Sequence, residues 1–305
     1  MTAFLLRRLF SGAIVLFVVA SLTFGILQLV PGGPFDKEKK LPAEILANIQ
    51  AKYQLDQPLW KQYLLYIHGL VQGDLGPSYK YIDRNVNDIL KETLPVSAQL
   101  GTLALLVTLI LGLGTGISST IRPNSIFDRL VIFLSTLGIS IPNFVLGAGL
   151  IWGFALGLGI LPAARWESFN HAILPALTLG IPSAAFLARL TRSSILEAAG
   201  EDYVQTARAK GLSENRILTK HILKNSLIPV VTVFGPLAAA LITGSFIVEH
   251  IFAIPGMGRF FVTAVANRDY PLIMGVTLVY TTFLVIANLV VDILYSLLDP
   301  RMRPN

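Results

Sequence analysis

The chain contains no cysteine among its 305 residues, and only 14% of its residues are charged. The absence of cysteine excludes a disulfide scaffold, thiolate catalysis and a thiolate metal site. Ordinary globular proteins carry about 25% charged residues, so too few charges are present to cover soluble domains. Apolar residues make up 53% of the chain, and the mean hydropathy is +0.66. This composition excludes a disordered chain, a coiled coil and collagen, and predicts a surface that faces a lipid bilayer.

Motifs of enzyme chemistry are missing from the sequence as well. The four histidines stand at positions 68, 171, 221 and 250, and none lies four residues from another. A zinc site is therefore not expected. The sequence has neither a Gly-x-Ser-x-Gly elbow nor a Gly-x-x-x-x-Gly-Lys-Ser/Thr phosphate loop. We expect a chain that binds no cofactor, hydrolyses no ATP by itself and is not an enzyme. A membrane-embedded hydrolase would need a nucleophile and base, or paired metal ligands, and neither is visible.

Long runs without Asp, Glu, Lys or Arg are present instead. Each can hold the roughly 20 apolar residues that a helix needs to cross about 30 Å of hydrocarbon, and none alternates as a barrel strand does. The third run is long enough for one span with a flanking loop, but not for two. The first is too long for the apolar part of a signal peptide, so an uncleaved first span is expected. We therefore predict an all-α integral membrane protein with six transmembrane helices, in the runs Leu9–Phe35, Thr93–Ile121, Leu130–Ala164, Ser168–Ala188, Ser226–Val248 and Tyr270–Val291.

The distribution of basic residues predicts the orientation of the chain. Six spans place both termini on one side. With that side cytoplasmic, thirteen basic residues lie inside and three lie in the short outer loops, as the positive-inside rule requires. The net charge of +6 thus indicates the basic cytoplasmic loops of a multi-pass membrane protein and no nucleic-acid partner. The predicted parts are a cytoplasmic anchor with the first span (1–35), an external segment (36–92) and a five-span core (93–305) with a cytoplasmic loop at 190–225.

Ionisable and small residues occur in or near the spans. Glu249, His250 and Asp292 stand near span ends, where an interfacial position with water nearby is expected. A proton relay would want such groups at mid-membrane on several helices, which weakens the case for a proton-coupled secondary transporter. The pairs Gly112-x-x-x-Gly116 and Gly149-x-x-x-Gly153 predict close helix approach.

The loop 190–225 contains the most distinctive stretch of the chain. Its residues predict a helix from about Glu201 to Lys210, ended by Gly211 and followed by a second basic helix that leads into a span. Glu201 and Asp202 stand at the helix start, where the helix dipole favours acidic groups. A short capped helix of this kind suits docking to a soluble partner. The residues also allow a solvated basic loop attracted to anionic lipid headgroups.

Tyr203–Leu212 resembles one loop of the permease subunits of bacterial ABC importers. In the dipeptide, oligopeptide and nickel branch this loop has the pattern Tyr-Val-x-Thr-Ala-Arg-Ala-Lys-Gly-Leu. Further stretches resemble the family in the same order along nearly the whole chain, and Gly76–Tyr81 is similar to the oligopeptide permease B subunit in particular. The general importer motif has Glu and Pro where this chain has Gln205 and Lys224, and the literal Glu197-Ala198-Ala199 is out of register. The other matching stretches are Leu29–Gly32, Gly73–Gly76, Pro255–Gly258 and Leu298–Arg301.

The resemblance implies a type I ABC importer permease fold, a location in the bacterial inner membrane and a set of partners. These are a second, homologous permease subunit, two ATP-binding subunits that hold ATP and magnesium, and a periplasmic solute-binding protein. Oligopeptides are the expected substrate, with dipeptides, nickel, murein peptides or glutathione as alternatives within the family. A stand-alone channel or secondary transporter is the alternative outside it. Arg122–Arg129 would form a smaller cytoplasmic contact. The residues expected to dock the ATPase are Tyr203, Thr206, Ala207, Arg208, Ala209, Lys210, Gly211 and Leu212.

Overall fold

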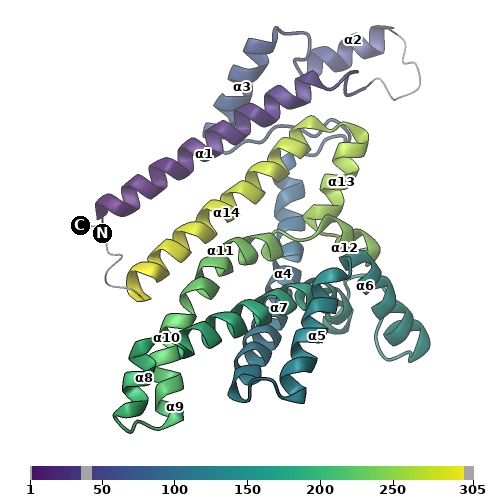
Figure 1. The fold of residues 1–305 in the computed structure, drawn as a ribbon. Helices are drawn as coiled ribbons and strands as arrows, with labels where there is room; N and C mark the ends of the chain where they lie inside the picture. The colour runs from purple at the N-terminus through teal and green to yellow at the C-terminus, as the bar shows by residue number, and fades with distance from the viewer. Residues whose placement is uncertain (1, 36–42, 299–305) are drawn as a thin grey trace. The chain divides into compact units, whose positions relative to one another are not determined.

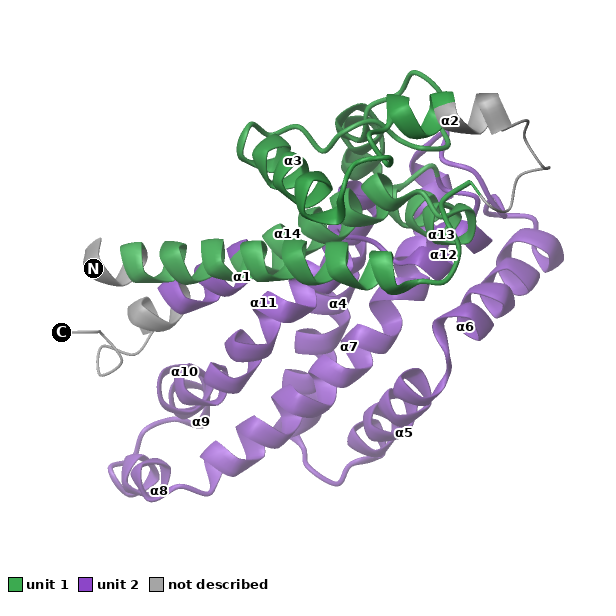
Figure 2. Cartoon of the chain, turned by 90° about the horizontal axis from the view of Figure 1, so that it is seen from above, with its two compact units in different colours: residues 1–96, 255–285 green, residues 97–254, 286–305 purple. Residues whose placement is uncertain are grey.

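The computed structural model describes residues 2–35 and 43–298, with side chains described over 6–35 and 48–293. Every regular element in these ranges is a helix (Figure 1), apart from one isolated bridge between Pro77 and Asn85. The chain packs as two compact units, coloured in Figure 2: residues 1–96 with 255–285, and residues 97–254 with 286–305. The all-α prediction is confirmed.

Within the described residues, five helical segments are long and apolar enough to cross a membrane. They correspond to the first, second, fourth, fifth and sixth predicted runs. Four of these segments are single helices, and the remaining one, Ile228–Ile251, joins the two helices α11 and α12. The single helices are α1 (Thr2–Leu29), α4 (Val86–Ile121), α7 (Phe169–Ala199) and α14 (Tyr270–Leu298); α11 covers Ile228–Ile242 and α12 covers Phe246–Ile251.

The third predicted run is broken in two. Helix α5 (Ile126–Ser140) is followed by α6 (Asn143–Leu150) and the π-helix η1 (Ile151–Gly157), and the direction changes by 107° between the two parts. Pro142 has no N–H for the helix ladder and pushes the preceding residue into an extended conformation. Ile141 accordingly has φ −81° and ψ 122°. The prediction of six spans holds when this bent pair counts as one span; the break itself was not expected from the hydropathy.

The first unit is built around the start of α4. Besides α1 it contains α2 (Ala43–Lys52), α3 (Leu59–Val71), α13 (Met257–Asn267) and the first part of α14. Its apolar core combines residues of α4, α13 and α14, which are far apart in the sequence. The buried members are Val86, Ile89, Leu90, Met257, Ala264, Tyr270, Leu272, Ile273 and Val276.

A buried polar network fixes the corner between α13 and α14. The Asp269 side chain is fully buried, accepts a short hydrogen bond from the Ser78 hydroxyl, and accepts a second from the Tyr79 N–H at 3.1 Å. On either side, Arg268 and Tyr270 donate to the carbonyls of Gly33 and Gly32, at 3.2 and 3.4 Å. We call Arg268–Tyr270 the 268–270 corner. It contacts two distant stretches of the chain, about 190 and about 235 residues away.

The second unit is organised around α7, and glycines let α4 lie directly against it. A Cβ on Gly112 would come within 2.9 Å of Leu187 Cβ, and one on Gly116 within 2.8 Å of Thr191 Cβ. The predicted close approach at Gly112-x-x-x-Gly116 is therefore confirmed. Around Gly149 and Gly153, the described part of the chain brings no other helix within 4 Å of the Cβ position.

The ionisable residues near the spans have different surroundings. Glu249 in α12 is fully buried and accepts a hydrogen bond from the Ser97 hydroxyl at 2.8 Å, so the expectation of a water-facing carboxylate is wrong at this position. It lies beside Gly244, where the chain turns with φ +85° and leaves no room for a Cβ. His250 is exposed and Asp292 is partly buried.

The two compact units do not follow the three parts proposed from the sequence. That proposal divides the chain by side of the membrane, whereas the units reflect packing, and residues 255–285 return to pack with the first 96. The three-part division stays a prediction. Residues 36–42 and the predicted family stretch at Asp299–Arg301 lie outside the described residues.

Candidate functional site

The predicted docking helix forms as α8, Asp202–Ala209. Glu201 precedes it in an extended conformation, φ −70° and ψ 149°, and its carbonyl accepts the first helical hydrogen bond, from Val204 N at 3.0 Å. Asp202 lies in the first turn and Arg208 in the last. A negative charge at the start and a positive charge at the end both interact favourably with the helix dipole. This explains why so short and polar a segment is helical.

Gly211 ends α8 as expected. Its φ is +76°, in the left-handed region that glycine adopts without strain. The Gly211 N–H donates to the Arg208 carbonyl at 2.9 Å, and the Leu212 N–H donates to the Ala207 carbonyl at 3.3 Å. This pair of hydrogen bonds is a Schellman motif, and the packing of Leu212 near Ala207 supplies its usual apolar contact. The chain reverses sharply here, so the end of α8 is a fixed tip.

One face of α8 anchors the helix to the second unit. Val204 is fully buried and Ala207 is 5% exposed. Both pack in an apolar cluster with residues of α7 and of the segment after α8. Ala207, one of the predicted docking residues, therefore supports the helix from behind. The other buried members of the cluster are Ile195, Ala198, Ile217 and Ile222.

The opposite face of α8 is exposed. Tyr203 is 38% exposed, and the Thr206 hydroxyl donates to the Asp202 carbonyl at 2.9 Å, within its own helix. Leu212 is partly buried beneath the tip. The predicted docking residues that share this exposed surface are Tyr203, Thr206, Arg208, Ala209, Lys210 and Gly211; we call these six residues the α8 surface.

An ion pair joins α8 to the next helix, α9 (Glu214–Ile217). Arg208 donates to both carboxylate oxygens of Glu214, Nε at 3.0 Å and Nη2 at 3.3 Å. The hydrogen bonds and the charge of Glu214 raise the pKa of Arg208 above its ordinary value. Because both side chains are exposed to solvent, the pair orients the guanidinium more than it stabilises the fold.

The predicted second basic helix follows α8. It begins with α9, continues as the π-helix η2 (Leu218–Ile222) and α10 (Leu223–Ser226), and leads into α11. Single π turns are common at functional sites. The anchoring cluster under α8 includes Ile217 and Ile222 of this segment. Helix α8 therefore packs against the segment that leads into α11.

A buried ion pair holds the Arg122–Arg129 turn to α7, and no sequence pattern indicated this pair. Arg192 donates to both oxygens of Asp128, Nε at 2.6 Å and Nη2 at 2.8 Å. The Asp128 side chain is 1% exposed and that of Arg192 is 21% exposed. Asp128 also accepts from Asn124 N at 2.8 Å, and its own N–H donates to the Ser125 hydroxyl, forming a reciprocal helix cap. The turn is thereby fixed to the helix that leads into α8.

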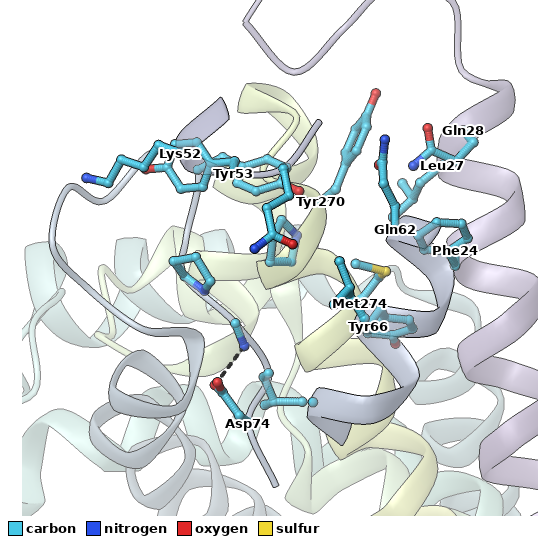
Figure 3. A pocket seen from close by; sticks show the side chains of 18 residues that line it. Phe24, Leu27, Gln28, Lys52, Tyr53, Gln62, Tyr66, Asp74, Tyr270 and Met274 are labelled. Carbon is cyan, nitrogen blue, oxygen red and sulfur yellow. Dashed lines mark hydrogen bonds between the residues drawn. The ribbon is translucent and has the colours of Figure 1, made fainter. Parts of the chain in front are cut away.

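The first unit contains a cavity of about 320 Å³ between α1, α3 and the start of α14 (Figure 3). Glutamine and tyrosine side chains dominate its polar lining, and Lys52 and Asp74 supply the charges. The hydrogen bond from Asn85 lowers the pKa of Asp74, and burial raises the pKa of Tyr79. Such a lining offers hydrogen bonds to uncharged polar groups. Its polar residues include Gln28, Gln54, Gln62, Tyr53, Tyr66, Tyr79 and Tyr270.

No group of three or more His, Cys, Asp or Glu residues that could hold a metal ion occurs in the described ranges. The ordered features available for function are thus the α8 surface, the turn at Arg122–Arg129 and the cavity of the first unit.

The whole chain matches known transport proteins. Residues 108–304 match the family described as binding-protein-dependent transport system inner membrane component. Residues 1–100 match the N-terminal family of the same membrane components.

Relatives in several bacteria match nearly end to end. The dipeptide transport system permease protein DppB of Bacillus subtilis is 44% identical over 99% of this chain and 98% of its own length. The oligopeptide transport system permease protein OppB of Haemophilus influenzae is 41% identical over 99% of this chain and all of its own length. OppB of Escherichia coli K12 is 39% identical over the same shares.

Solved structures share the fold at low sequence identity. The inward-facing MetNI methionine ABC transporter matches with a TM-score of 0.58 and 16% identity, over 69% of this chain and 96% of that chain. An amino acid ABC transporter crystallised with histidines matches with a TM-score of 0.56 and 15% identity, over 69% and 94%. The resemblance that Tyr203–Leu212 indicated is confirmed by the family matches: this chain is a multi-pass membrane permease that belongs to the binding-protein-dependent transport system inner membrane components.

Proposed function

We propose that this chain is a membrane-spanning subunit of an ATP-driven importer that carries peptides across the bacterial inner membrane. The relatives at 39–44% identity are named for oligopeptide or dipeptide transport systems and match over 99% of the chain. Both names occur at similar identity. We favour oligopeptides because Gly76–Tyr81 resembles the oligopeptide subunit, with dipeptides as the alternative.

The observation that carries the proposal is the two-sided construction of α8. Val204 and Ala207 on its inner face pack in the apolar cluster of the second unit, while the α8 surface is exposed. A rigid helix with one anchored and one free face suits docking in a groove of a soluble partner. That partner would be an ATP-binding subunit, which holds ATP and magnesium.

The anchoring cluster suggests how motion of such a partner would reach the membrane. Val204 and Ala207 would transmit a displacement of α8 to α7. They would also transmit it to Ile217 and Ile222, which lie in the segment before α11. Two spans would then move with the partner. ATP binding favours one state only through contacts that differ between the two states. A second permease subunit, two ATP-binding subunits and a periplasmic solute-binding protein complete the proposed assembly.

Mass spectrometry of proteins that co-purify with the tagged chain from mild-detergent membranes tests the assembly. A second permease and two ATP-binding chains are the expected result. Purification of the folded chain without any ATP-binding chain would contradict the proposal and favour a stand-alone channel. Uptake of labelled dipeptides and pentapeptides by the same cells then decides between the two peptide classes.

Gly211 gives a sharper test of the docking role. Gly211→Asp places a negative charge at the tip of α8, where nothing lies within 4 Å of the Cβ position. We expect ATP-dependent peptide uptake to fall at least several-fold, with normal amounts of protein in the membrane. Gly211→Asn is the matched control, because Asn has the same size and also tolerates positive φ. Unchanged uptake in the Gly211→Asp variant would contradict the proposed docking role of α8.

A further inference from the structure

The cavity of the first unit is lined by polar groups whose orientation is fixed but whose capacity for hydrogen bonds is not used up. The Gln62 amide nitrogen donates to the carbonyls of Leu55 and Gln57, at 3.2 and 2.8 Å. These two hydrogen bonds hold the amide in place, and its oxygen accepts no hydrogen bond from the described residues. Since Gln62 lines the cavity, it offers an oriented acceptor to a ligand.

The Asp74 carboxylate is a second oriented acceptor, on a different side of the cavity from Gln62 (Figure 3). Its Oδ1 accepts from Gly76 N and from Asn85 Nδ2, both at 3.0 Å, whereas no donor in the described part of the chain reaches Oδ2. The carboxylate is exposed and therefore belongs to the rim. A ligand that satisfies both Gln62 and Asp74 has to donate hydrogen bonds, as N–H groups do.

Gln54 lines the cavity from a strained position. Its φ is +56°, in a region that residues with a side chain seldom adopt. It ends α2, where Gln54 N donates to the Ala51 carbonyl at 3.2 Å and Leu55 N to the Gln50 carbonyl at 2.8 Å. Glycine would form this turn without strain. The Gln54 amide has no partner within the described ranges, so the strain points to a use of this side chain in the cavity.

One side of the cavity is apolar. The rings of Phe24 and Tyr66 are stacked, with their centroids 5.8 Å apart, and Met274 lies beside them (Figure 3); we call these three side chains the apolar wall. Leu65 and Leu75 also line the cavity. The volume of about 320 Å³ is at the lower end of the range of ligand pockets, about 300–1,000 Å³. A ligand portion of a few residues at most therefore fits.

The combination of an apolar wall with oriented acceptors selects a class of ligand. A lipid acyl chain has no hydrogen-bond donor, and a sugar presents little apolar surface. A peptide combines apolar side chains with backbone N–H groups. The cavity also lies at the end of α1 remote from the N-terminus and at the start of α14, which the predicted orientation places outside the cell membrane.

We propose that this cavity binds a short stretch of the transported peptide, with an apolar side chain against the apolar wall and backbone N–H groups at Gln62 and Asp74. Gln54 contributes a further hydrogen bond. The inference rests on the proposed function, because it takes peptides as the solute.

Cross-linking with a photoreactive tripeptide tests the site. The probe has p-benzoylphenylalanine between two alanines and is irradiated with the complete transporter in lipid nanodiscs, and mass spectrometry locates the modified residues. We expect modification within 62–76 and 270–274, reduced several-fold by an excess of Ala-Phe-Ala. Modification confined to other parts of the transporter, or unaffected by Ala-Phe-Ala, would overturn the proposal. If peptide-free binding protein blocks the modification and Ala-Phe-Ala does not, the cavity receives a loop of that protein, which would equally overturn it.

Uptake of Ala-Phe-Ala by the unmodified transporter separates this inference from the proposed function. Absence of uptake would contradict the proposed function. Uptake without any modification of the cavity would contradict the cavity site alone.

Gln54→Gly gives a readout that a merely structural role would not produce. Glycine removes the strain at positive φ, so the melting temperature should not fall. The KM for Ala-Phe-Ala uptake should rise several-fold with kcat little changed, because a binding contact is lost. Ala253→Gly, at another positive φ of 51° outside the cavity, is the matched control and should leave KM unchanged.

Leu65→Trp is the complementary variant, because Leu65 is 41% exposed and a larger side chain there fills the cavity without entering the core. We expect a larger rise in KM than in Gln54→Gly. An unchanged KM in both variants would overturn the proposal.

Discussion

Helix α8 and the 268–270 corner are both short segments that adjoin a long helix, α7 and α14 respectively, but they are fixed in opposite ways. Helix α8 is held by apolar packing from one side and by a glycine turn, and its polar side chains face outward. The corner is held by a buried carboxylate and by hydrogen bonds to distant backbone groups. The first arrangement leaves a surface open for a partner. The second uses its polar groups inside the chain and joins three separate stretches.

The difference implies that polar substitutions should affect function at α8 and stability at the corner. Exposed ion pairs contribute little to folding. Removing one member of a buried pair leaves a group without a partner and destabilises strongly.

The Asp128–Arg192 pair lies in the same unit as α8 but is buried like the corner. Arg192→Ala leaves the buried Asp128 carboxylate without its bidentate partner, and we expect a loss of about 3 kcal/mol in stability. Thermal unfolding in detergent measures the effect as a melting temperature lower by several degrees. The double variant Asp128→Asn with Arg192→Gln should be more stable than Arg192→Ala alone. A melting temperature equal to that of the original protein would mean that the pair is not buried in the folded chain.

Asp269→Ala should produce the next largest effect. It leaves the Ser78 hydroxyl and the Tyr79 N–H without an acceptor, at a cost of about 2 kcal/mol. Limited proteolysis should then cut the stretch around residues 78–81 more rapidly. Asp83→Asn is the control, because the Asp83 side chain is 86% exposed and Asn tolerates the positive φ of 59° at this position. If Asp83→Asn is cleaved as rapidly as Asp269→Ala, the corner is not what holds this stretch.

Glu214→Gln should have the smallest effect on stability. It removes the charge that orients Arg208, but both side chains of the pair are exposed, so the melting temperature should not change measurably. ATP-dependent uptake should change instead, because the guanidinium belongs to the α8 surface. A clear loss of stability with normal uptake would reverse the contrast between the two regions.

The sequence predicted the fold where the signals were local. Apolar runs located the long helices, because each helix satisfies its backbone within itself. The stop at Gly211 followed from the conformational freedom of one residue. The break at Ile141 was also encoded locally, by Pro142, but the run is uniformly apolar and hydropathy alone does not record direction.

The sequence predicted less about the pairings between distant residues. Ser78 and Asp269 are 191 residues apart, and Asp128 and Arg192 are 64 apart; nothing in either residue type selects its partner. The inward position of Ala207 depends on how α7 and α9 pack around α8. The packing of α3 along α1 was not predicted either, because the contact joins Ser21 and Tyr63, and neither residue type selects its partner.

The glycines of α4 have a consequence for how this helix tolerates insertions. An extra residue between Gly101 and Gly112 would keep the helix long and apolar, but would rotate everything beyond it by about 100°. Leu111, now 42% exposed, would occupy the position of Gly112 and meet α7, where even a Cβ is too close to Leu187. A change that hydropathy would not register would thus separate α4 from α7. Sequence variation in α4 is therefore limited by its register against α7, which cannot shift by even one residue.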